Sequence, residues 1–188
     1  MPNRSRCGPS MGEPVNLTIE FLNAAHGEDA ARILSQAFNN DAGETRKFVD
    51  EVMVEENRIH GRIATMVAMV NGKLAGVIAA RKPRDKNPDN IYALTDLAVD
   101  PAFGGRGIGH KLLAAAETFI SGEWLKGQFG YARLWDYTKR AKPDSHFYED
   151  AGYVPDQNTD GLPQGDPILI KPLNEDAFPL AEPDKLAP

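Results

Sequence analysis

The sequence predicts one α+β domain in which helices are layered on a β-sheet. Segments with the two-residue period of strands are interspersed with segments of helical period. Their order is strand, two helices, three strands, helix, strand, helix, and one or two strands. The chain has 188 residues, of which 41% are hydrophobic, which is enough for a single core. We find no internal repeat, so a solenoid is not expected.

The first predicted elements are a strand and two helices. Residues 17–21 alternate between apolar and polar side chains, a pattern typical of a half-buried strand. Ala30, Leu34 and Phe38 recur every four residues after an acidic first turn, which predicts a helix. A second apolar stripe predicts the next helix; it consists of Phe48, Val49, Val52 and Met53.

A hairpin and a central strand follow. The apolar runs 63–70 and 74–80 are joined by Asn71-Gly72, a dipeptide that suits a tight hairpin turn. Residues 91–99 are apolar on both alternating faces, which predicts a central strand buried on both sides.

The last elements are a helix, a strand, a short helix and a strand. A strand begins at Tyr131 and a final one at Ile168. Pro143 suits the first turn of the short helix, and Gly152 suits a left-handed cap just after its end. The longer helix that precedes these elements has an apolar face formed by Ile108, Leu112, Ala116 and Phe119.

The two ends of the chain have the composition of flexible segments. We expect a flexible arm at residues 1–14, a folded domain at residues 15–173 and a flexible tail at residues 174–188. The arm has arginines but no apolar stretch, so it is not a secretory signal and we expect a cytoplasmic protein. Its lone Cys7 is expected to be chemically idle.

The charge balance limits the classes of partner. A net charge of −6 disfavours nucleic-acid binding, which needs a basic face, and is compatible with a cationic small substrate. No apolar run approaches the length of a membrane span. His26, His60 and His110 lack metal-ligand spacing, so we expect structural or surface histidines and no metal.

A glycine-rich loop lies between the central strand and the longer helix. Glycines let the backbone approach a ligand closely, and a helix N-terminus favours an anion such as phosphate. The plainer alternative is a loop that only reverses the chain. The loop is not a P-loop, because His110 and Lys111 follow Gly109 where such a loop has Lys and Ser/Thr. The dinucleotide fingerprint G-x-G-x-x-G also fails.

Two motifs carry a resemblance to a known family. The segment LTDLAVDPAFGGRGIGHKLL resembles the acyl-CoA-binding motif Q/R-x-x-G-x-G/A of the GNAT superfamily of N-acyltransferases. About forty residues later, HFYEDAGYVP resembles the family's FYEKxGF segment. Gly104 departs from the family's Arg or Gln, and Ala141 from its frequent Asn. The first motif falls on Gly104, Gly105, Arg106, Gly107, Ile108 and Gly109.

The resemblance implies a fold and a cofactor. The fold is a mixed, largely antiparallel central sheet, splayed at its centre, with helices on both faces. Acetyl-CoA would be the co-substrate, with no metal. Its diphosphate would bind the loop from Gly104 to His110, and its pantetheine arm the backbone of Leu97, Ala98 and Val99. Five nearby cations either pair with its phosphates or are simply solvated: Arg106, Lys111, Lys139, Arg140 and Lys142.

The resemblance also suggests catalytic residues. Tyr148 matches the phenol that protonates the departing thiolate, and it points about 100° away from the helix face shared by Phe147 and Ala151. A half-buried tyrosine that only packs is the alternative. Asp96 is the first candidate for the general base, and its alternative is a buried acid bonded to backbone; His146 is a second candidate.

The function implied is N-acetyltransfer from acetyl-CoA to a primary amine of a small molecule or peptide, by direct transfer in a ternary complex. The acceptor would lie between the two helices that follow the first strand and the loop 156–167. Asp41 and Glu44 at the helix junction favour a cationic acceptor. Relatives are often dimers, so a homodimer stays open. The competing hypothesis is a non-catalytic module that binds or senses acyl-CoA.

Overall fold

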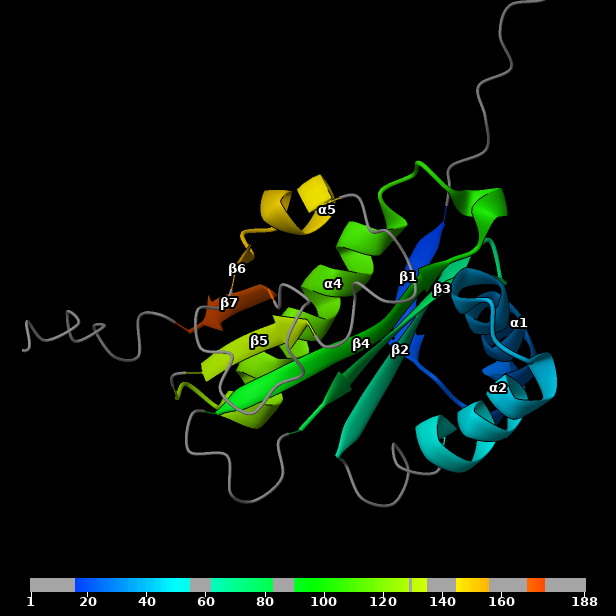
Figure 1. Cartoon of the computed structure of the whole chain (residues 1–188), viewed down its shortest axis with the longest axis horizontal. Coiled ribbons are helices and arrows are strands. Elements are labelled where there is room, and N and C mark those ends of the chain that lie inside the picture. The colour runs from blue at the N-terminus through cyan, green and yellow to red at the C-terminus, as the bar shows by residue number, and fades with distance from the viewer. Residues whose placement is uncertain are drawn as a thin grey trace, which may run out of the picture.

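The computed structural model describes residues 16–54, 62–82, 90–128, 130–134, 145–155 and 169–174. Within them, seven strands form one sheet in the order β1-β2-β3-β4-β5-β7-β6 (Figure 1). Neighbouring strands are antiparallel except β4 and β5, which are parallel. The strands are β1 (Leu17–Phe21), β2 (Ile63–Val70), β3 (Lys73–Arg81), β4 (Ile91–Val99), β5 (Gly130–Leu134), β6 (Val154–Pro155) and β7 (Leu169–Leu173).

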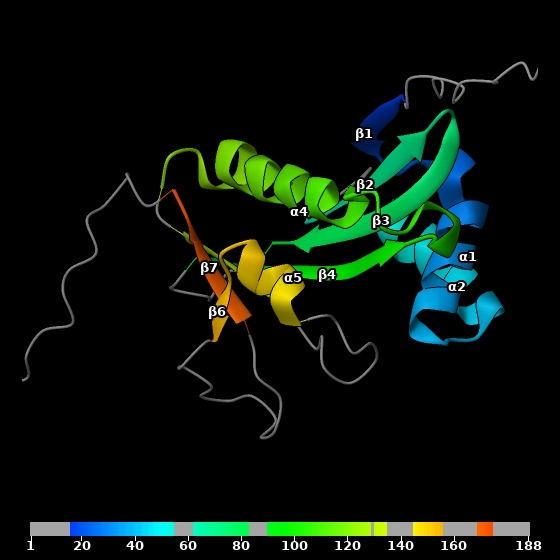
Figure 2. The ribbon, with the colours of Figure 1, turned by 90° about the horizontal axis from the view of Figure 1, so that it is seen from above.

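Helices cover both faces of this sheet, as Figure 2 shows for α4 on one side and α1 and α2 on the other. One apolar cluster joins the sheet to α4 and the segment around α5, and a second joins it to α1 and η2. The α+β class and the order of elements predicted from the sequence are confirmed. The helices are η1 (Ala24–His26), α1 (Gly27–Phe38), α2 (Ala42–Phe48), η2 (Val49–Val54), η3 (Pro101–Phe103), α4 (Ile108–Phe119), η4 (Ile120–Leu125) and α5 (Ser145–Asp150).

Local chemistry explains the boundaries of the first helices and of the hairpin. α1 ends at Asn39, whose left-handed backbone (φ 52°) terminates the helix. The Asp41 carboxylate then accepts the N–H of Glu44 and caps α2. Asn71 and Gly72 have φ of 49° and 75°, as a two-residue hairpin turn between β2 and β3 requires.

The central strand β4 contains a bulge at Asp96, which has a left-handed backbone with φ of 58°. The register between β3 and β4 shifts at this point. Tyr92 and Leu94 belong to the α4-side cluster, whereas beyond the bulge Ala98 belongs to the α1-side cluster. One extra residue therefore exchanges the two faces of the strand.

Burial of β4 on both faces, predicted from its sequence, is only partly correct. Tyr92 and Leu94 are buried, but Ile91 and Ala93, which alternate with them along the strand, are only partly buried. Figure 2 shows that α1 and α2 lie over the end of β4 that leads into the glycine loop, away from the first half of the strand.

The described pairing of β4 with β5 covers only the first part of β4. Their parallel ladder pairs Ile91–Leu94 with Tyr131–Leu134, and β4 runs on to Val99 beyond the last described pair. The central splay expected for the fold stays a prediction, because the residues that follow Leu134 lie outside the described ones. None of the described helices has the length and apolar character needed to cross a bilayer.

Gly76 on β3 lets α4 lie close to the sheet, and its replacement tests that packing. A Cβ there would lie 2.9 Å from the Ala98 carbonyl oxygen and 2.9 Å from Leu112 Cδ1. We expect Gly76→Ala to lower the free energy of unfolding by about 1–3 kcal/mol, measured by urea unfolding. Gly122→Ala is the control, because no atom lies within 4 Å of its added methyl group. Equal stability of the two variants would contradict the tight packing.

Candidate cofactor and catalytic site

The glycine loop begins with a turn anchored on β3. The N–H of Asp100 donates to the Ala75 carbonyl at 2.9 Å, and the Asp100 carboxylate accepts the N–H of Ala102 at 2.9 Å. The short helix η3 then closes with a hydrogen bond from the Gly104 N–H to the Pro101 carbonyl at 3.1 Å. Strand β4 therefore passes into the loop through a capped turn.

The loop itself is open above its glycines. Gly105 and Gly107 have left-handed backbones, with φ of 72° and 70°, and a Cβ at either would meet no atom within 4 Å. Gly107 is the N-cap of α4 and provides no side-chain hydrogen bond. The first N–H groups of α4 also lack intrahelical acceptors. Together these groups could hold an anion, because they lie at the positive end of a helix.

The two sequence motifs meet at the start of α4. The rings of His110 and Phe147 lie 4.2 Å apart between centroids. A Cβ at Gly109 would lie 3.1 Å from Cε2 of Phe147, so only glycine fits there without a shift of that ring. The His146 side chain is 78% exposed and lies 3.4 Å from the Glu149 carboxylate. Residues about forty positions apart thus form one packed unit.

Tyr148 is buried, with 7% of its surface exposed. Its ring contacts those of Phe147 and Tyr153 edge-on, at 4.8 and 6.0 Å between centroids. The helix-wheel argument for a position outside the core is therefore wrong: Phe147 and Ala151 are the less buried residues. The short helix packs on more than one of its sides, because Tyr148 lies in the α4-side cluster and Phe147 and Ala151 also pack against it.

Tyr153 completes this aromatic group. Its hydroxyl donates to Glu117 at 2.8 Å, and Glu117 also pairs with Lys171 at 2.8 Å. Burial, followed by the neighbouring Glu117 charge, raises the pKa of the Tyr153 phenol. This phenol therefore stays protonated and joins the segment after α5 to α4, and Glu117 in turn joins α4 to Lys171 on β7.

Asp96 lies in a cluster of polar side chains. Its Oδ2 accepts from the Thr95 hydroxyl at 2.6 Å and from Arg81 Nη2 at 3.2 Å. Arg81 Nε donates to the same hydroxyl at 3.1 Å, and its guanidinium lies 5.8 Å from the centroid of the Phe48 ring. The Asp96 side chain is 25% exposed. The described hydrogen bonds of this carboxylate thus come from the side chains of Thr95 and Arg81. The alternative considered from the sequence was a buried acid bonded to backbone groups.

The backbone candidates for the pantetheine arm lie just beyond the bulge. Leu97 and Val99 pack partly buried on the α4-side cluster, and Ala98 is buried on the other side. Their side chains therefore serve the core, which leaves only their backbone groups for a ligand. No β5 partner for these three residues occurs among the described pairs.

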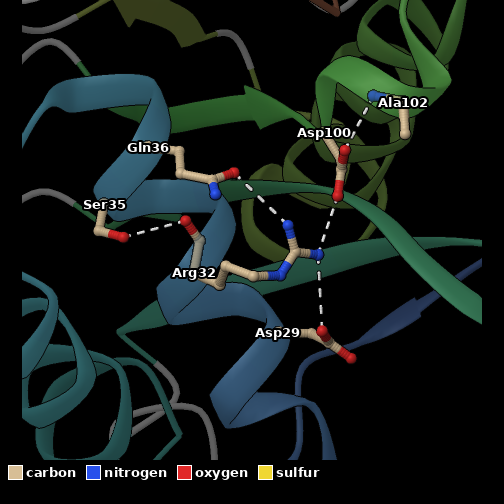
Figure 3. A network of polar contacts seen from close by, with 6 residues as sticks. All are labelled: Asp29, Arg32, Ser35, Gln36, Asp100 and Ala102. Atoms are coloured by element: carbon tan, nitrogen blue, oxygen red, sulfur yellow. Dashed lines mark hydrogen bonds and ion pairs between the residues drawn. The ribbon is translucent and has the colours of Figure 1, made fainter.

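Sequence reasoning missed a polar network around Asp100, which Figure 3 shows. Arg32 on α1 donates to Asp100 Oδ2 at 2.8 Å, and it also lies 3.5 Å from Asp29. The Ala102 N–H and then Arg32 lower the pKa of Asp100. The Asp-Pro pair after a strand is a typical turn signal and could have identified Asp100. No sequence pattern around Arg32 indicates its role, because its partner Asp100 lies in a distant segment.

The remaining candidates divide into those the structure describes and those it does not. Arg106 and Lys111 are exposed, and Asp41 caps α2. Among the described residues, no group of three or more His, Cys, Asp and Glu could hold a metal. Outside the described residues lie Cys7, His60, Lys139, Arg140, Ala141, Lys142, Pro143 and the loop 156–167.

His26 has the structural role expected for it. Its Nδ1 accepts the N–H of Asn23 at 3.3 Å, and its Nε2 lies 3.1 Å from the Glu20 carboxylate. This histidine joins the end of β1 to η1, on the route into α1.

Comparison with known proteins identifies the family. A family model described as the acetyltransferase (GNAT) family matches residues 28–153, which span the glycine loop and the segment around α5. The chain belongs to the GNAT acetyltransferase family. A comparison with curated proteins found no match.

Solved structures of other GNAT proteins share this fold. The Escherichia coli N-acetyltransferase YhbS in complex with CoA is 17% identical, with a TM-score of 0.65 over 89% of this chain and 87% of that one. PaiA N-acetyltransferase from Thermoplasma acidophilum, in complex with coenzyme A, is 18% identical, with a TM-score of 0.60 over 83% and 98%. An aminoglycoside 6'-N-acetyltransferase complexed with coenzyme A is 16% identical, with a TM-score of 0.61 over 89% and 99%.

Acid titration tests the Asp100 network of this GNAT protein. The folded-state pKa of Asp100 lies below that of an unfolded aspartate, about 3.9. The charged carboxylate therefore stabilises the fold above that value, and this contribution is lost as the pH falls through the folded pKa. We expect Asp100→Asn to lower the free energy of unfolding by about 1–2 kcal/mol at pH 7.

Near pH 3, the difference in free energy of unfolding between wild type and Asp100→Asn should be smaller than at pH 7. Urea unfolding at both pH values measures it. Asp150→Asn, which changes an exposed carboxylate on α5, is the control and should have little effect. A difference for Asp100→Asn that does not shrink at low pH would contradict the prediction.

Proposed function

We propose that this GNAT protein transfers an acetyl group from acetyl-CoA to a primary amine by direct attack in a ternary complex. One observation carries the proposal: a glycine loop that is open to solvent leads into the uncapped N-terminus of α4. It stands directly after β4, whose last residues have no β5 partner among the described pairs. Such a loop suits the diphosphate of coenzyme A, and the end of β4 suits its pantetheine arm.

The loop residues fit this ligand through their main chain. Gly105 and Gly107 adopt the positive φ that turns successive N–H groups toward one side, and among the described residues no atom lies within 4 Å of a Cβ built at either. Gly104, where the family has Arg or Gln, still contributes its backbone. Arg106 and His110 are exposed beside the loop and are the described side chains we assign to the phosphates.

The chemistry consists of one bond exchange and two proton movements. The neutral amine attacks the thioester carbonyl carbon, so a C–N bond forms as the C–S bond breaks. The ammonium proton goes to Asp96, directly or through water, and the thiolate takes a proton from Tyr148. A backbone N–H of Leu97, Ala98 or Val99 would stabilise the oxyanion.

The acceptor we propose is cationic and small, or a lysine of a peptide. The protein carries a net charge of −6, and exposed Glu44 lies at the α1–α2 junction on the Asp96 side of the sheet. An aminoglycoside N-acetyltransferase shares the fold. The Asp41 carboxylate contributes less than the sequence suggested, because it already caps α2.

Two observations favour the second candidate, an acyl-CoA-binding module without catalysis. Tyr148 is buried among aromatic rings, and Asp96 is already paired with Arg81. Release of free CoA from acetyl-CoA with a panel of amines separates the two functions. Turnover with any amine supports the transferase, and binding of acetyl-CoA without turnover supports the module.

The glycine loop is tested by Gly107→Val. Valine strains a backbone with φ of 70° and places a branched side chain in the open space where the diphosphate would bind. We expect binding of acetyl-CoA to be lost in calorimetry. Gly127→Val is a matched control, because Gly127 has φ of 82° and equally open space but lies after α4. Unchanged affinity of Gly107→Val would show that the loop is only a turn.

The proton donor is tested by Tyr148→Phe. This change keeps the buried ring and removes the hydroxyl, so kcat should fall by about tenfold or more while the affinity for acetyl-CoA stays the same. Tyr153→Phe is the control: it removes a hydroxyl bonded to Glu117 and should lower stability without a comparable loss of kcat. Equal kcat for wild type and Tyr148→Phe would remove Tyr148 from the mechanism.

A further inference from the structure

Arg32 links helix α1 to the turn that starts the glycine loop (Figure 3). Its Nη2 lies 2.8 Å from Asp100 Oδ2 and 3.5 Å from Asp29 Oδ1, and its Nη1 lies 3.5 Å from Gln36 Oε1. By distance, the bond to Asp100 is the strongest of the three. The other two come from the same helix and hold the guanidinium in place.

Asp100 connects Arg32 to the turn through its hydrogen bonds. Its second carboxylate oxygen, Oδ1, accepts the N–H of Ala102 at 2.9 Å, and its own carbonyl accepts the N–H of Phe103 at 2.8 Å. Its N–H donates to Ala75 on β3 at 2.9 Å. One residue thus joins β3, η3 and α1, and η3 leads directly into Gly104.

The charges of the pair also bear on an anionic ligand. The Asp100 side chain is 11% exposed, whereas the Arg32 side chain is 43% exposed. Without the guanidinium, a largely buried negative charge would stand four residues before Gly104, close in sequence to a loop suited to a diphosphate. Arg32 therefore offsets a charge that would disfavour that ligand and fixes the residue that carries it.

We propose that Arg32 is a positioning residue for the cofactor loop: through Asp100 it fixes the turn η3 and thereby the direction in which residues 104–109 present their N–H groups. The inference rests on the proposed binding of acetyl-CoA. It assigns to α1, on the opposite face of the sheet from α4, a role in cofactor affinity. It requires no direct contact between Arg32 and the cofactor.

The test is the affinity of the full chain for CoA, measured by calorimetry for wild type and Arg32→Gln. We expect the Kd for CoA to rise about tenfold, because a charged hydrogen bond that orders the loop is lost. The KM for acetyl-CoA should rise in parallel, and kcat at saturating acetyl-CoA should stay within about twofold of wild type. Arg32→Lys, which keeps the charge, should recover part of the affinity.

A matched control is Arg46→Gln on α2. The Arg46 side chain is also 43% exposed and forms a short ion pair, at 2.6 Å with Asp50, but within its own helical segment. Its loss should leave the Kd for CoA unchanged. A second variant, Asp100→Asn, and the double variant Arg32→Gln/Asp100→Asn complete a cycle. If Arg32 acts through Asp100, the Kd of the double variant for CoA should be no higher than the higher of the two single-variant Kd values.

The outcomes separate this inference from the proposed function. If wild type binds CoA and Arg32→Gln binds it equally well, even with a lower melting temperature, the ion pair is only structural and the inference is overturned. Additive losses in the double variant would overturn the route through Asp100. If wild type shows no binding of CoA, the proposed function fails, and this inference fails with it.

Discussion

The bulge in β4 is the constraint on which the rest of the structure depends. Asp96 adopts a left-handed backbone in the middle of the central strand, and this single extra residue exchanges the faces of everything after it. Leu97 and Val99 consequently pack toward α4 and Ala98 toward α1. The described pairing with β5 ends before the bulge, and the strand then enters the turn at Asp100. The packing of β4 on both faces of the sheet and the start of the glycine loop thus depend on one stretch of backbone.

Close packing around α4 connects this stretch of backbone to the second motif. Gly76 allows the helix to approach β3 and β4, and Gly109 allows the Phe147 ring to lie against the first turn of the helix. The rest of α4 contributes fully buried residues such as Leu112 and Ala116 to the core. Because the interior is close-packed, a shift of α4 would move both the N-terminal end of the helix and the aromatic group around Tyr148.

Two ion pairs connect β4 to the side of the sheet that carries α1 and α2. Arg81 joins Asp96 to the Phe48 ring on α2, and Arg32 joins Asp100 to α1. The Arg81–Asp96 pair lies at the bulge, and the Arg32–Asp100 pair lies just after the end of the strand. In an acidic protein, these arginines balance carboxylates that the fold places next to its proposed site. Helices α1 and α2, where we propose that the acceptor binds, are thereby linked to the strand and loop proposed to hold the cofactor.

The sequence by itself determined the features that arise between near neighbours in the chain. The Asn71-Gly72 turn, the apolar faces of α1 and α4, and the glycine loop before α4 depend on contacts a few residues apart, so their patterns could be interpreted directly. Only the tertiary structure decided the bulge at Asp96, the burial of Tyr148 and the pairing of Arg32 with Asp100. Each of these is set by a partner in a distant segment, and no local pattern of side chains encodes which partner that will be.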